Sequence, residues 1–149
     1  NVYNGNAGKE GWEKITLAST IGGMVINTAG VTLAHGMEHP ASGLRDIVHG
    51  KGLAALTPAI IEASYTGNES KFADIAKLFG GKEAKDLALK IRELLKSINL
   101  NCTLSDLGIE EKDIPWMAEN CMKVSAASVA NNPVVFTQEQ IADIYKKAL

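Results

Sequence analysis

The stretch that decides the fold runs from residue 34 to residue 63 and reads AHGMEHPASGLRDIVHGKGLAALTPAIIEA. It contains every histidine of the 149-residue chain, namely His35, His39 and His49. His35 and His39 are four residues apart in a segment of helical character. Both imidazoles are therefore predicted to project from one face of one helix.

A second helix is expected after a turn. Pro40, Ser42 and Gly43 interrupt the first pattern, and the apolar run GKGLAALTPAIIEA resumes a helical one. His49 would then lie near the start of the second helix and face the first two imidazoles. Histidine is the most common metal ligand among the side chains and titrates near neutral pH. The pattern predicts a partial metal site; the alternative is three ordinary helix residues bonded to the backbone.

The rest of the chain is also expected to be helical. Apolar residues recur at three- and four-residue steps over residues 72–79 and 84–98. Asp113 precedes Ile114-Pro115 and is predicted to cap a helix, and Thr137 is predicted to begin the last one. No alternating run is long enough to indicate a sheet. The sequence thus predicts an all-α fold, a helical bundle.

Residues 15–34 form an uncharged segment of twenty residues, which is the length of a membrane span. Six of these residues are Ser, Thr or Asn and three are Gly, and no aromatic belt follows. We therefore expect a helix that neighbouring helices bury on all sides, rather than a membrane segment.

Composition indicates one compact domain over residues 10–149, after a flexible leader over residues 1–9. The net charge of −2 and a pI of about 5.9 provide no basic surface for nucleic acid or an anionic membrane. Cys102 and Cys121 lack C-x-x-C spacing, so reduced thiols in a cytoplasmic protein are expected.

Residues 29–62 resemble the signature region of the iron-containing (group III) alcohol dehydrogenases. That family reads H-x-x-x-H-P-x-x-x-x-x-D-x-x-H-G, and this chain matches it at His35, His39, Pro40, Asp46, His49 and Gly50. The C-terminal stretch is similar too, with a helix after Ile-Pro, an Asn-Asn-Pro turn and a last short helix. Arg45 and Val48 depart from the aromatic residue and the proline that the family often carries, which bears on substrate specificity.

The resemblance implies the C-terminal helical domain of such an enzyme, with the dehydroquinate synthase-like fold. It implies interconversion of alcohols with aldehydes or ketones by hydride transfer to or from NAD or NADP. His35 and His49 correspond to two of four ligands of a divalent metal, usually Fe(II), although Zn(II) also suits imidazole. His39 corresponds to a histidine beside the nicotinamide that relays a proton or orients the cofactor. Asp46 either accepts the second ring N–H of a ligand or caps the loop.

The other two family ligands belong to an upstream D-x-x-x-H turn. The 34 residues before His35 contain neither aspartate nor histidine, and no glycine-rich strand-to-helix turn precedes them. The expectation is a C-terminal part without its N-terminal nucleotide-binding domain, inactive alone and prone to form homo-oligomers. The alternatives are a non-catalytic helical interaction domain and one half of a split enzyme complemented by a separate chain.

Overall fold

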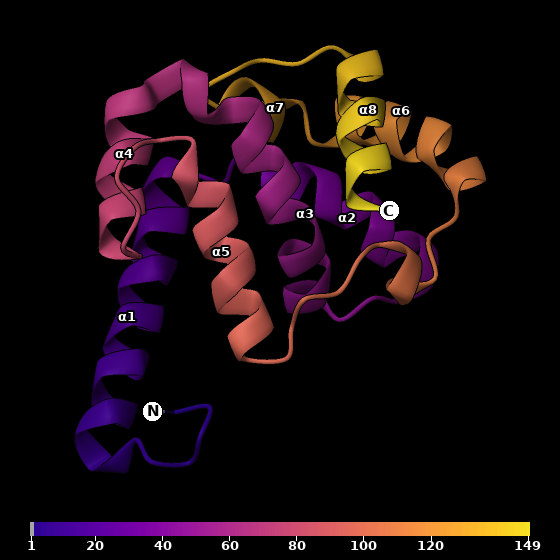
Figure 1. Cartoon of the computed structure of the whole chain (residues 1–149). Coiled ribbons are helices and arrows are strands. Elements are labelled where there is room, and N and C mark those ends of the chain that lie inside the picture. Colours follow the sequence, from indigo (N-terminus) through magenta and orange to yellow (C-terminus); the bar gives the residue numbers. More distant parts are fainter. Residues whose placement is uncertain (1) are drawn as a thin grey trace. The chain divides into compact units, whose positions relative to one another are not determined.

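The computed structural model describes residues 2–149, and that part of the chain contains helices and turns but no strand (Figure 1). This confirms the predicted all-α class. The chain divides into two compact units, one up to Val31 and one from Thr32 onward. The elements are α1 (Gly8–Ala29), α2 (Leu33–Arg45), α3 (His49–Ser64), η1 (Tyr65–Asn68), α4 (Glu69–Leu78), α5 (Asp86–Ser97), η2 (Ser105–Leu107), η3 (Glu111–Asp113), α6 (Ile114–Val124), α7 (Ala126–Ala130) and α8 (Gln138–Ala148).

The second unit is built around α2 and α3, which pack against each other. Helix α2 also packs against α6 and α7, whereas α3 packs against α5 and α8, and α8 packs against α6 (Figure 1). These helices bury apolar side chains between them, and the large ones with almost no exposed surface include residues of α2, α3, α6 and α8: Leu33, Met37, Leu56, Ile114, Met117, Ile141 and Tyr145. This core fixes the mutual position of α2 and α3, which carry the histidines.

Two contacts hold α2 in the core. The buried Tyr145 hydroxyl of α8 donates a hydrogen bond to the Met37 carbonyl at 2.5 Å. Burial raises the pKa of Tyr145, so its hydroxyl keeps its proton. A Cβ on Gly36 would lie 3.2 Å from the Cβ atoms of both Ser125 and Ser128. The missing side chain therefore lets α2 approach the α6–α7 junction closely.

The turn between the two histidine-bearing helices lies later than the sequence predicts. Helix α2 continues through Pro40 to Arg45, so the predicted interruption at Pro40, Ser42 and Gly43 is wrong. Proline removes one helical N–H and costs stability, but the buried Met37 and Ala41 beside it keep this turn of helix in the core. The chain turns instead at Asp46, which has a φ of +50°.

Side chains cap the first turns of α4 and α8, and the cap at Thr137 confirms the predicted start of the last helix. Asn68 accepts a hydrogen bond from the Lys71 N–H at the start of α4, and Thr137 accepts one from the Gln140 N–H at the start of α8. Asp113 is the N-cap residue of α6 and Pro115 lies in the first turn, as predicted, but the Asp113 side chain makes no cap bond to the helix. Its carboxylate accepts instead from Arg45 Nη2 at 2.6 Å, which is a stronger, charge-assisted bond.

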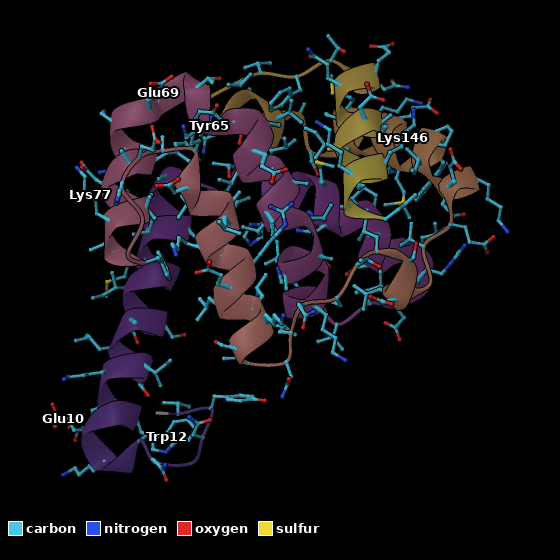
Figure 2. The ribbon with its side chains drawn as sticks, viewed as in Figure 1. Glu10, Trp12, Tyr65, Glu69, Lys77 and Lys146 are labelled. Carbon is cyan, nitrogen blue, oxygen red and sulfur yellow. The ribbon has the colours of Figure 1, made fainter. Side chains whose placement is uncertain are left out.

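Helix α1 differs most from expectation, because none of its residues is buried. Figure 2 shows Glu10 and Trp12 on its first turns, where Glu10 pairs with Lys14 at 2.7 Å. The helix belongs to a unit that contains no second helix against which to pack. The prediction that residues 15–34 are buried on all sides is therefore wrong over residues 15–29, although Leu33 at the start of α2 is buried. The large apolar side chains of α1 are exposed: Trp12, Ile15, Leu17, Ile21, Met24, Val25 and Ile26.

Across residues 2–149, no single helix has the length and hydropathy needed to cross a membrane; α1 and α2 reach these limits only when taken together, across the break between them.

Candidate metal centre

The three imidazoles converge where α2 meets the beginning of α3. His35 and His39 are one helical turn apart on α2, with ring centroids separated by 6.2 Å. His49 is the first residue of α3, and its ring centroid lies 5.2 Å from that of His35 and 6.0 Å from that of His39. The structure thus brings together the three histidines that the sequence singles out.

The spacing of His35 and His49 suits two ligands of one metal ion. A ring nitrogen binds zinc at about 2.0–2.1 Å, so two imidazoles on a tetrahedral ion have centroids about 5.3 Å apart. The His35–His49 separation of 5.2 Å meets this condition, and His39 lies further from both rings. Imidazole nitrogens also suit Fe(II) and Zn(II) chemically. The centroid distance and the donor chemistry of this pair are therefore compatible with the metal that the resemblance implies.

A buried carboxylate that the sequence analysis missed holds His49. Glu38 is on α2, next to His39, and its exposed fraction is 0%. One of its oxygens, Oε2, lies 2.5 Å from His49 Nδ1, and the other accepts a hydrogen bond from the Ser42 hydroxyl. The signal in the sequence is a charged residue between Met37 and Ala41, on the side of the helix that enters the core. This contact leaves Nε2 as the free ring nitrogen of His49.

Gly52 makes room for that carboxylate. A Cβ added to Gly52, on the first turn of α3, would lie 2.7 Å from Glu38 Oε1 and 2.8 Å from Glu38 Cγ. Real Cβ atoms do not come so close to other atoms, so any larger residue would displace Glu38. The close approach of α3 to the glutamate thus depends on this glycine.

The electrostatic surroundings favour a neutral His35. Partial burial lowers the pKa of His35 below 6.5, and the neighbouring His49 and His39 lower it further, while Glu38 opposes them. Only a neutral imidazole has a lone pair available for a metal. His35 is therefore in its ligand form at neutral pH.

Arg45 and Asp46, at the C-terminal end of α2, do not contact the ring nitrogen of His49. Asp46 ends α2, with its N–H bonded to the Ser42 carbonyl, and the ring nitrogen of His49 is bonded to Glu38 rather than to Asp46. Arg45 extends to the loop before α6, where its Nε donates to the Gly108 carbonyl at 2.9 Å. Arg45, which departs from the family pattern, therefore links α2 to the loop before α6 and stabilises the fold.

The described residues do not form a complete metal site or a nucleotide site by themselves. Within residues 2–149, no group of three His, Cys, Asp or Glu side chains is arranged to hold a metal ion. Both cysteines are free, and burial raises the pKa of Cys121 to about 11, which keeps it a thiol. The same residues contain no strand that could begin a dinucleotide-binding turn, so they do not fit a nicotinamide nucleotide site.

The fold and the site define a class of protein, namely an all-helical domain in which two imidazoles lie close together where two helices meet. All 149 residues match the C-terminal part of the Fe-containing alcohol dehydrogenase family. The 1,3-propanediol dehydrogenase of Klebsiella pneumoniae is 36% identical over 144 residues, which cover 91% of this chain and 37% of that protein. The chain belongs to the Fe-containing alcohol dehydrogenase family and corresponds to its C-terminal domain.

Solved structures agree with this assignment. An archaeal halo-thermophilic alcohol dehydrogenase from a Red Sea brine pool aligns with a TM-score of 0.86 and 31% identity over 94% of this chain and 38% of that one. The NADH-dependent butanol dehydrogenase A of Thermotoga maritima aligns with a TM-score of 0.67 and 29% identity over 77% of this chain and 32% of that one. The chain spans less than two-fifths of the length of each of these three proteins.

Proposed function

We propose that this domain supplies half of the metal shell of an enzyme that interconverts small alcohols with aldehydes or ketones, with NAD or NADP as the hydride carrier. The observation that carries the proposal is the 5.2 Å spacing of the His35 and His49 rings. The names of the relatives, a propanediol dehydrogenase and a butanol dehydrogenase, support small alcohols as the substrate class.

Each histidine has a distinct role in this proposal. His35 and His49 hold a divalent metal, Fe(II) or Zn(II), through their neutral imidazoles. A metal bound there supplies Lewis-acid chemistry, which lowers the pKa of an alcohol. His39 is exposed beside the pair, and there it moves a proton at a ring nitrogen or orients the nicotinamide. The nucleotide is bound mainly by an N-terminal domain, and the NADH dependence of the Thermotoga maritima relative supports a nicotinamide cofactor.

We expect the 149 residues, expressed alone, to show no dehydrogenase turnover. They place two imidazoles at ligand spacing and carry no strand-to-helix turn for a pyrophosphate within residues 2–149. The check is an assay with several short alcohols, NAD and NADP, with Fe(II) or Zn(II) added. A rate above that of the His35→Ala variant would show that the chain is catalytically complete and would contradict this expectation.

We also expect these 149 residues to self-associate. Large apolar side chains are exposed along α1, and exposed apolar area tends to find a partner. Light scattering should show a mass that rises with concentration, and Leu17→Glu should reduce it. Thr20→Glu adds the same charge to α1 without removing apolar surface and serves as the control. A monomer at high concentration that binds no apolar dye would contradict this.

A further inference from the structure

Glu38 is a fully buried carboxylate with a defined partner on each oxygen. Moving a carboxylate out of water is costly unless it is paired and hydrogen-bonded. Here Oε1 accepts from the Ser42 hydroxyl, and Oε2 lies 2.5 Å from His49 Nδ1. The neighbouring glycine, Gly52, leaves the space that the carboxylate occupies. The Ser42 hydroxyl and the space left by Gly52 thus hold the Glu38 carboxylate against Nδ1 of His49.

We propose that Glu38 is a positioning residue that fixes the tautomer and orientation of His49. Its carboxylate accepts the Nδ1 proton, so the lone pair of the neutral ring is on Nε2, the nitrogen that is left for a metal. A carboxylate behind a ligating histidine also raises the basicity of that ligand. The metal-binding part of this inference rests on the proposed function, whereas the tautomer of His49 does not.

A purely structural role for Glu38 would be to clamp α2 to α3, since the contact joins residues eleven positions apart. That role requires the same hydrogen bond, but it does not require that Nε2 be unprotonated or that metal affinity depend on Glu38. The two roles therefore differ in the proton position on His49 after substitution, and in metal affinity measured on variants that remain folded.

The first experiment determines the tautomer of His49 without any metal. In ¹⁵N NMR spectra of the chain at alkaline pH, where imidazole is neutral, His49 should carry its proton on Nδ1. In Glu38→Leu the acceptor is gone, and the proton should shift toward Nε2. Glu38→Met has a side chain of similar length without an oxygen to accept the ring N–H, and it covers the case in which Glu38→Leu does not fold. Asp46→Asn removes a nearby carboxylate that does not hold the ring and should leave the tautomer unchanged.

A wild-type His49 protonated on Nε2, or a tautomer that is the same in wild type and in both Glu38 variants, would overturn the proposal. Circular dichroism of each variant shows whether its helices are retained. Because this readout needs no metal, it gives an answer even if the proposed metal-binding function fails.

The second experiment measures affinity for Zn(II) by competition with a chromophoric chelator, in an enzyme that carries this domain together with its nucleotide-binding half. Loss of such a carboxylate partner lowers metal affinity about 10- to 100-fold. We expect this loss for Glu38→Gln and no loss for Asp46→Asn. Absence of binding by the wild type would contradict the proposed function, while equal affinity of wild type and Glu38→Gln would contradict the role of Glu38 alone.

Discussion

In a complete enzyme that carries this domain, His35→Ala and His49→Ala should each lose bound metal and activity together. Both rings lie at the spacing of two ligands of one ion, so removal of either opens the metal shell. His39→Ala should keep its metal and lose only rate, because its ring is further from both. General acid–base groups contribute about a hundred- to ten-thousand-fold, which sets the range of the expected loss.

Metal analysis of the three purified variants, together with their rates, checks this division of roles. The pH dependence of the rate should also change in His39→Ala, because a group that titrates near neutral pH has been removed. If His39→Ala contains as little metal as His35→Ala, the pair on α2 is itself the chelate and the assignment of His49 is wrong.

The second large effect is on stability. Leu56→Ala should lower the free energy of unfolding by about 2–5 kcal/mol, the usual cost of removing a fully buried leucine side chain. Leu56 lies on α3 with an exposed fraction of 0%, within the core that joins α3 to its neighbours. Its loss leaves a cavity beneath the helix that begins with His49. Urea denaturation of the chain, followed by circular dichroism at one protein concentration, measures the change.

Leu78→Ala is the matched control for this measurement. The same atoms are removed from α4, but Leu78 is 83% exposed, so the change should stay within about 0.5 kcal/mol. Equal effects of the two substitutions would mean that the core of the second unit does not contain Leu56 as described.

Most of the fold could be predicted from the sequence because its helices have clear periodicity and caps. The steps of three and four residues over 84–98 became α5, and the Thr137–Gln140 capping box began α8. The turn after α2 was misplaced because Pro40 is a strong local signal for a helix end. Burial of the residues around Pro40 depends on helices far along the chain, and local sequence does not reveal it.

The candidate site could be predicted in part. The spacing of the three histidines indicated their convergence, since four residues make about one helical turn. The contact of Glu38 with His49 was missed because it depends on how closely α3 approaches α2, which Gly52 permits. The exposure of α1 was also missed, because an uncharged segment indicates burial without indicating what covers it.

We infer that His35 and His49, and not His39, bind the metal. The most direct measurement is anomalous diffraction at the absorption edge of the bound metal, from crystals of an enzyme that contains this domain and its nucleotide-binding half. We predict an anomalous peak within bonding distance of His35 and of Nε2 of His49, with His39 outside that distance. A peak bonded to His39 in place of His49, or bonded to His49 through Nδ1, would contradict the account.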